Sequence, residues 1–248
     1  MNGPQYIRFA FPGLGKVCCI FGTRLGGVSS DVYAELNVSL EVGDEPENAA
    51  VNREVLKKEL DLKAWTELKQ VHGDSILFDP SEDLLKGAGT EGDGIALSGP
   101  GEGALIKTAD CQPIFVAHES ERYVLAMHCG WRGNRMKFPE TGIRAFCSHF
   151  GLPPAELMAV RGPSLGPCCA RFHSFDEHWS AEFAEYYNTE TRNMDLWLLT
   201  RDQLIRAGLH PENIFSLDLC TRCREDLFFS YRRETLCGRQ GNIIFFKE

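Results

Sequence analysis

The 248-residue chain lacks any apolar run long enough to cross a membrane. Its opening segment also lacks the basic start and uninterrupted apolar stretch of a secretory signal peptide. These two absences predict a cytoplasmic protein with no membrane partner. No fixed-period repeat, low-complexity tract or Pro/Ser-rich linker divides the sequence, so we expect a single domain over residues 1–248.

Positive charge is also scarce. The chain has 26 Lys and Arg against 35 Asp and Glu, and its formal net charge is −9. Because affinity for a phosphate backbone depends on clustered Lys and Arg, this balance argues against a nucleic-acid partner. The hydrophobic fraction of 43% is ordinary for a globular protein with a substantial core.

Cysteine, in contrast, is abundant, with ten residues. In a chain without an export signal, cysteines are more often reduced thiols, buried apolar groups or metal ligands than a disulfide framework. Cys18 and Cys19 lie in an apolar run that is typical of a buried strand. Cys220 and Cys223 have the spacing of half a zinc clip, but no second pair follows them, so we interpret them as structural thiols.

The order of apolar runs and turn residues predicts an α+β fold of mixed β-sheets flanked by helices, since strands and helices do not alternate in a strict βαβ rhythm. Strands are expected at residues 5–11, 16–23, 33–40, 93–97, 104–108, 113–117, 123–128, 157–160 and 242–246. A first helix is expected to begin near residue 44, with Asp44 as its N-cap and Val51, Val55 and Leu60 on one face. Further helices are expected at residues 139–150, 176–187 and 199–207.

Three short segments place a metal-binding side chain at the end of a predicted strand. They are residues 69–73 with His72, residues 108–113 with Cys111, and residues 127–133 with His128. Imidazole and thiolate form a borderline ligand set that suits zinc, and three protein ligands leave one coordination position open for catalysis. The alternative is that these are separate buried histidine and cysteine side chains, because no compact motif joins them.

These strings resemble the YfiH family, also called the laccase-domain or multicopper polyphenol oxidase family. The resemblance continues over nearly the whole chain. The matching pieces outside the three segments are residues 22–24, 26–29, 36–37, 42–44, 52–53, 162–169, 220–221, 228–232 and 238–239.

The resemblance implies a single α+β domain with α/β/β/α layers and a zinc ion, with copper as the alternative metal, held by catalytic His72, Cys111 and His128. It also implies a purine nucleoside phosphorylase that cleaves adenosine, inosine or methylthioadenosine with phosphate, and in some members deaminates adenosine. Copper-dependent phenol oxidation and an amidase role on peptidoglycan precursors are attached to the same family. This chain departs in carrying Cys129 where alanine is common, which places a second thiol beside the predicted metal.

Phosphorolysis requires groups that bind an anion, and a guanidinium fork fits phosphate oxygens. Arg53 and Arg132 are the foremost candidates, with Arg232 and Arg24 also in matching segments; the alternative for each is a structural ion pair. Asn37 is a candidate for binding sugar or base, or a turn former. Ser230, which precedes Arg232 in a matching segment, completes the predicted substrate-binding set.

Further alternatives stay open at this point. Asp110 either orients a ligand histidine or caps its turn, and Trp131 either stacks on a purine or packs beneath the following turn. Cys111 would also suit a cysteine hydrolase if His128 activated it as a nucleophile. A copper oxidase needs several histidine-rich centres, whereas only His72 and His128 of the seven histidines lie in convincing motifs. A non-catalytic zinc protein would be expected to close its site with a fourth ligand. The sequence does not predict an oligomeric state.

Overall fold

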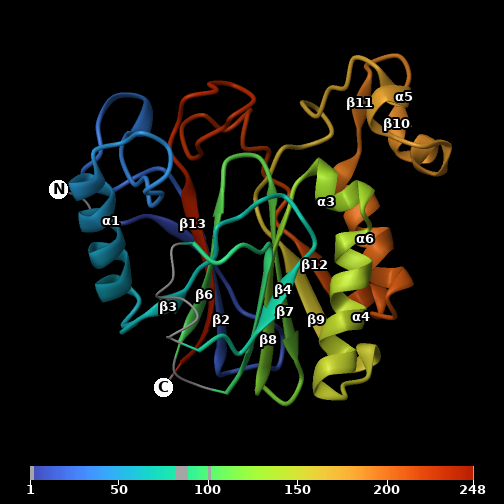
Figure 1. Cartoon of the computed structure of the whole chain (residues 1–248), viewed down its shortest axis with the longest axis horizontal. Helices are drawn as coiled ribbons and strands as arrows, with labels where there is room; N and C mark the ends of the chain where they lie inside the picture. The colour runs from blue at the N-terminus through green and yellow to red at the C-terminus, as the bar shows by residue number, and fades with distance from the viewer. Residues whose placement is uncertain (1–2, 82–88, 100–101, 248) are drawn as a thin grey trace.

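Two β-sheets pack face to face at the centre of the molecule, and helices cover their outer faces (Figure 1). The structure is a computed structural model that describes residues 3–81, 89–99 and 102–247. The first sheet has the order β1-β2-β13-β6-β3, formed by Tyr6–Phe9, Val17–Gly22, Gln240–Phe246, Gly103–Thr108 and Trp65–Thr66. The second has the order β12-β9-β7-β8-β5-β4, formed by Ile214–Ser216, Leu157–Arg161, Gln112–His118, Tyr123–Cys129, Gly94–Ser98 and Ile76–Phe78.

The main core lies between the two sheets. Phe21 of β2 and Phe115 of β7 stack across it, with ring centroids 5.1 Å apart. Every residue of β2 is buried: Cys19 faces the space between the sheets, whereas Cys18 belongs to the apolar cluster on the outer face, beneath α1. A strand covered on both faces is apolar throughout rather than alternating, which explains the continuous run in the sequence. The predicted buried strand is confirmed.

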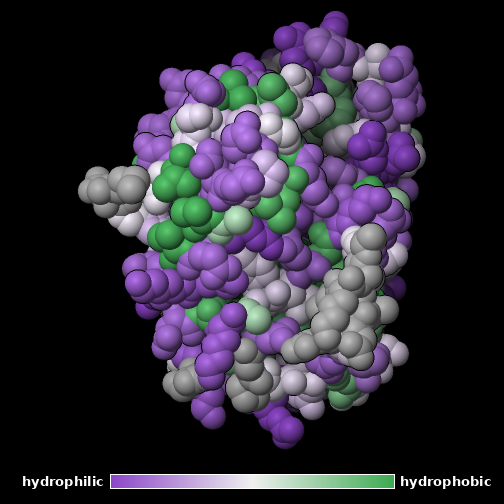
Figure 2. Space-filling model, turned by 60° about the vertical axis from the view of Figure 1, so that its left-hand side comes forward, coloured by the Kyte–Doolittle hydropathy of each residue, from purple (hydrophilic) through white to green (hydrophobic). Residues whose placement is uncertain are grey.

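Helix α1 (Pro46–Glu59) covers the outer face of the first sheet. It begins close to the predicted position, but its buried face differs from the predicted one. Leu56 and Leu60 are buried, whereas Val51 and Val55 are 44% and 40% exposed. Figure 2 brings this side of the molecule forward and shows hydrophobic surface lying among hydrophilic side chains. The Asp44 carboxylate accepts hydrogen bonds from Ser29 and Asn37, and α1 has no side-chain cap, so the predicted cap was wrong.

Three helices lie beyond the second sheet: α3 (Trp131–Arg135), α4 (Phe138–Phe150) and α6 (Leu196–Arg206). Helix α4 ends at Gly151, whose φ of +69° is the left-handed conformation that favours glycine at a helix end. Helices on both outer faces and two packed sheets between them confirm the α/β/β/α layers. No helix among the described residues has the length and apolar character needed to span a membrane.

Two predicted elements were wrong. The region 33–40 forms no strand; it follows the short 3-10 helix η1 (Asp31–Tyr33), and the backbone N–H of Leu36 donates to the Arg24 carbonyl. The helix predicted at 176–187 is broken into α5 (Phe175–His178) and η3 (Ala181–Tyr186). Trp179 interrupts it with an extended backbone, which lets the indole ring pack among Phe172 and Phe183.

The remaining short elements were not predicted. Their bounds are η2 Pro154–Glu156, η4 Pro211–Asn213, and the two-stranded sheet of β10 (Tyr187–Asn188) and β11 (Asn193–Met194). More important for function, the chain crosses from the first sheet to the second between β6 and β7, in the turn that contains Cys111. A turn that links two packed sheets lies at the edge of their common core, where a side chain is both supported and accessible.

Candidate active site

The structure brings the three predicted metal ligands together. His72 lies in the loop between β3 and β4, Cys111 in the turn from β6 to β7, and His128 near the end of β8. One donor atom from each side chain lies within 4.8 Å of the others, and His72 Nε2 is 3.8 Å from Cys111 Sγ. We call these residues the three-ligand site.

The local backbone at this site is unusual. His72 has a φ of +61°, and Asp110, just before Cys111, has a φ of +94°. Both values lie in the positive-φ region that residues other than glycine rarely adopt. Such conformations persist only where surrounding contacts impose them, and they concentrate at functional sites. Two of the three ligand-bearing turns are therefore held in shape by the rest of the fold.

The geometry fits a tetrahedral metal. A zinc ion with ordinary Zn–N and Zn–S bonds of about 2.0 and 2.3 Å requires a separation of about 3.6 Å between nitrogen and sulfur ligands, close to the 3.8 Å observed. Gly130 leaves the necessary space, because a β-carbon there would lie 2.9 Å from Cys111 Sγ and 3.3 Å from His72 Cδ2. The site thus offers three suitable donors and no fourth protein ligand among the described residues.

Asp93 organises this site, and the sequence did not single it out. Its carboxylate lies 2.7 Å from His128 Nδ1 and accepts hydrogen bonds from the backbone N–H groups of Val71, His72 and Gly73. Nε2 of His128 is thereby directed at the metal position. Burial acts to raise the pKa of Asp93, but its bonds with His128 and these N–H groups lower the pKa below its usual value. The one available signal was an acidic residue set between Gly92 and Gly94 at the entrance to a buried strand.

We expect Asp93→Asn to weaken metal binding by about 10- to 100-fold, because an amide holds the His128 ring and its tautomer less firmly than a carboxylate. Competition with a calibrated zinc chelator measures the dissociation constant directly. Asp79→Asn, at an exposed carboxylate that hydrogen-bonds Ser98, provides the matched control. An Asp93→Asn protein with wild-type zinc affinity would show that this carboxylate does not support the ligand.

Protonation prepares Cys111 for metal binding, whereas His128 must release a proton before its Nε2 can bind a metal. Burial acts to raise the pKa of Cys111, but the neighbouring His128 and His72 lower the pKa to about 6. Burial acts to lower the pKa of His128, but Cys111 and Asp93 raise the pKa to about 9. Cys111 is therefore held as a thiolate, the form of cysteine that binds metals.

The three-ligand site opens into a cavity of about 530 Å³, within the usual range for small-molecule sites of about 300–1,000 Å³. We call it the active-site cavity. Its apolar wall includes Leu165, Phe172, Leu196 and Tyr231, and its cationic lining consists of Lys107, Arg132, Arg232 and Arg239.

Of these cations, Arg132 and Arg232 have no carboxylate partner among the residues that the structure describes. Arg132 lies over the Trp131 ring at 4.8 Å, and Arg232 donates to the carbonyl of Arg171. Lys107, by contrast, lies 3.2 Å from both Glu41 and Glu67, and the Arg239 guanidinium donates to backbone carbonyls. Arg132 and Arg232 thus have unneutralised charge to offer an anion.

Three other residues predicted to bind substrate are not among those that line the cavity. Asn37 is fully buried, and its amide bonds the backbone of Ser39 and Arg239 as well as Asp44. Arg53 pairs with Glu67 and donates to the Val38 carbonyl. Ser230 is also buried, and its hydroxyl accepts from the Arg233 N–H. Arg24 likewise binds backbone carbonyls, of Ala34 and Glu225. Each has a structural role in this fold.

The structure also places three further residues that the sequence left open. Asp110 orients no histidine; its carboxylate accepts hydrogen bonds from the Thr221 hydroxyl and the Arg232 N–H, both at 2.6 Å. Trp131 lines the cavity but packs edge to face on Phe172, at 5.8 Å. Cys129 belongs to the apolar cluster beneath α4 and also lines the cavity, but its thiol is not a member of the ligand group; its effect on the metal stays a prediction.

Tyr231 lines the cavity and was not predicted from the sequence. It is 53% exposed, which is high for an aromatic side chain, and it stands between Ser230 and Arg232 in a segment already marked by the family resemblance. Its exposed ring offers a flat apolar surface at the mouth of the cavity.

Known proteins resemble this chain over nearly its full length. Residues 18–247 match the family model described as multi-copper polyphenol oxidoreductase laccase. Purine nucleoside phosphorylase YfiH of Escherichia coli is 31% identical over 240 residues, which cover 92% of this chain and 93% of that protein. Purine nucleoside phosphorylase YlmD of Geobacillus stearothermophilus is 28% identical over 260 residues, covering 97% and 93%. The crystal structure of YlmD from Geobacillus stearothermophilus has a TM-score of 0.88 at 27% identity, covering 98% of this chain and 96% of that one.

Proposed function

Because the chain belongs to the multi-copper polyphenol oxidoreductase laccase family, in which the relatives above are named purine nucleoside phosphorylases, we propose that it is an enzyme that cleaves purine nucleosides with phosphate. One observation carries the proposal: three convergent metal-binding side chains and two arginines without carboxylate partners share one cavity. The cofactor is zinc, bound by His72, Cys111 and His128; copper is the alternative that this donor set accepts.

Phosphorolysis transfers a sugar from a base to phosphate. An oxygen of phosphate forms a bond to C1′ of the ribose while the bond from C1′ to the purine nitrogen breaks, so the products are ribose 1-phosphate and the free base. The site must therefore hold an anionic nucleophile and stabilise the charge that develops on the departing base. Arg132 and Arg232 perform the first task, since a guanidinium donates two parallel hydrogen bonds to phosphate oxygens.

A metal ion bound at the three-ligand site supplies a Lewis acid beside the substrate. The chain's own residues supply the rest. Asp93 keeps the His128 ring and the 71–73 backbone in place, so the site is organised before substrate arrives. The apolar side chains of Phe172 and Tyr231 form the wall best suited to the flat purine ring.

The two other chemistries attached to this family fit the structure less well. Copper oxidases require several metal centres with histidine ligands, whereas only one of the two ligand groups among the described residues contains histidine: the three-ligand site, which has two. A cysteine hydrolase acting on peptidoglycan precursors would use Cys111 as a free nucleophile activated by His128, and a metal bound to the same thiolate prevents that.

The test is base release from adenosine, inosine and methylthioadenosine by zinc-loaded protein, with and without phosphate. We expect free purine and the corresponding sugar 1-phosphate in equal amounts, and only when phosphate is present; the sugar product is ribose 1-phosphate from adenosine and inosine, and 5-methylthioribose 1-phosphate from methylthioadenosine. Ammonia release from adenosine measures deamination in the same samples. Base release at a rate that does not depend on phosphate would rule out the phosphorylase, as would amide hydrolysis by the metal-free protein. Oxygen consumption with a phenol would favour the oxidase instead.

A further inference from the structure

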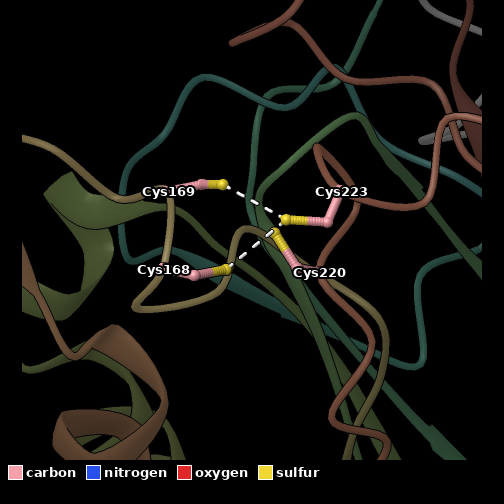
Figure 3. A group of neighbouring side chains, drawn as sticks. All are labelled: Cys168, Cys169, Cys220 and Cys223. Atoms are coloured by element: carbon pink, nitrogen blue, oxygen red, sulfur yellow. Dashed lines mark hydrogen bonds between the residues drawn. The ribbon is translucent and has the colours of Figure 1, made fainter.

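A second cluster of metal-binding side chains lies outside the three-ligand site. The sulfur atoms of Cys168, Cys169, Cys220 and Cys223 all lie within 4.8 Å of one another. Figure 3 shows the four side chains pointing toward a common centre from two separate loops. Cys223 Sγ lies 3.6 Å from Cys168 Sγ and 3.4 Å from Cys169 Sγ. We call these residues the four-cysteine cluster.

The sheet topology explains why the two cysteine pairs meet. Strands β9 and β12 are parallel neighbours, with Ser216 opposite Arg161, so the loops that follow them leave the same end of the sheet. The pairing continues past both strands: the Ser164 N–H donates to the Leu219 carbonyl and the Thr221 N–H to the Ser164 carbonyl. This ladder sets Cys168 and Cys169 beside Cys220 and Cys223. The second cysteine pair, which does not follow Cys223 in the sequence, thus lies about 50 residues before the first.

The dimensions of the cluster suit a tetrahedral ion. Four sulfur ligands at about 2.3 Å from zinc are about 3.8 Å from one another, and the measured separations of 3.4 and 3.6 Å require only small movements. All four residues are free cysteines in the structure. An all-thiolate tetrahedral set is typical of zinc or iron, and four protein ligands leave no open coordination position.

The surroundings compensate the negative charge that four thiolates would carry. The Gly166 N–H points at Cys220 Sγ, 3.3 Å away, and the Arg222 guanidinium lies 3.6 Å from Cys169 Sγ. Gly166 also begins the turn that carries the first pair, since its carbonyl accepts from the N–H groups of Cys169 and Ala170. Cys169 and Cys220 are buried, whereas Cys168 and Cys223 face solvent, so an ion can enter from outside.

We propose that Cys168, Cys169, Cys220 and Cys223 bind a structural zinc ion, separate from the catalytic centre. On binding, the four thiols lose their protons to solvent and the metal ties the loop after β9 to the loop after β12. Its place in the fold suggests what it supports. Thr221, next to Cys220, donates to Asp110 beside Cys111, and Phe172 of the first loop lines the active-site cavity. The ion holds one wall of that cavity in position.

The test is metal analysis of protein purified anaerobically with a thiol reductant, on wild type and on Cys168→Ser/Cys223→Ser. The double variant removes the two exposed ligands, so it disturbs packing least. We expect it to bind about one zinc per chain less than wild type and to unfold at a lower temperature. The matched control is Cys147→Ser, a thiol on α4 that belongs to neither ligand group; we expect its zinc content to equal that of wild type.

A second measurement does not depend on the double variant being folded. In Cys111→Ala protein, zinc X-ray absorption is expected to show only sulfur ligands at about 2.3 Å, since the histidine-containing site has been disabled. This outcome stands whether or not the protein is a phosphorylase. The proposal is overturned if Cys111→Ala protein holds no zinc, if iron takes its place, or if intact-mass analysis of anaerobic wild type shows the four cysteines paired as disulfides.

Discussion

Replacing Cys111 with alanine will remove the catalytic metal and lower kcat/KM for purine nucleosides by about a thousandfold. The thiolate is one of the three donors that the described residues supply at this site, and its loss deprives the site of its anionic ligand. A thousandfold loss corresponds to about 4 kcal/mol of transition-state stabilisation, which is the scale expected for a metal acting as a Lewis acid. Steady-state phosphorolysis of inosine and zinc analysis of the same samples measure both effects.

Cys147→Ala is the control for this experiment, because Cys147 is a buried thiol of α4 that is not among the residues lining the cavity. It is expected to keep wild-type metal content and activity. If Cys111→Ala retained phosphorolysis while losing its metal, catalysis would not run through the three-ligand site. If the wild-type protein were active only without metal, the nucleophile reading of Cys111 would replace the phosphorylase.

The second large effect concerns phosphate. The double variant Arg132→Ala/Arg232→Ala will raise KM for phosphate by at least about a hundredfold, with a smaller change in KM for the nucleoside. Each guanidinium contributes a charged hydrogen-bonding group worth about 1.5–3 kcal/mol to a bound anion. Neither arginine has a carboxylate partner among the described residues, so their removal leaves no buried acid unpaired.

Two further variants separate binding from structure. Arg144→Ala removes an exposed arginine of α4 that pairs with Glu140, and it should leave both KM values unchanged. Arg132→Lys/Arg232→Lys keeps the charge but loses the planar fork, so KM for phosphate should fall between those of wild type and the alanine variant. An unchanged KM for phosphate in the alanine variant would place the anion elsewhere in the cavity, with Lys107 and Arg239 as the remaining cationic groups of its lining.

The two proposed metal sites differ in function, one being catalytic and the other structural. The three-ligand site has two histidines, one thiolate and an open side facing the cavity, which is the pattern of a catalytic ion. The four-cysteine cluster offers four sulfur ligands and leaves no coordination position open, which is the pattern of a structural ion. Asp110 connects them, because its carboxylate binds Thr221 of the cysteine loop while its neighbour Cys111 belongs to the three-ligand site. Loss of the structural ion is therefore expected to affect the cavity at a distance.

The sequence alone determined the elements whose signals are local. Continuous apolar runs marked β2, β7 and β8, and Gly151 marked the end of α4, because burial on both faces and left-handed backbone depend on residues close together in the chain. The same holds for the site. His72, Cys111 and His128 were identified because each stands in a short segment whose residue types suit a metal ligand at the end of a strand.

The tertiary structure decided how distant segments meet and where long side chains point. Arg53 and Arg132 had equal standing in the sequence, but α1 directs Arg53 to Glu67, whereas Arg132, near the start of α3, reaches the cavity. Asp93 rather than Asp110 holds the ligand histidine because β5 and β8 are antiparallel neighbours, with Gly94 opposite Met127. The cysteine pairs meet because β9 and β12 are parallel. Strand pairing joins residues far apart in the chain, and local sequence patterns carry no record of which strands become neighbours.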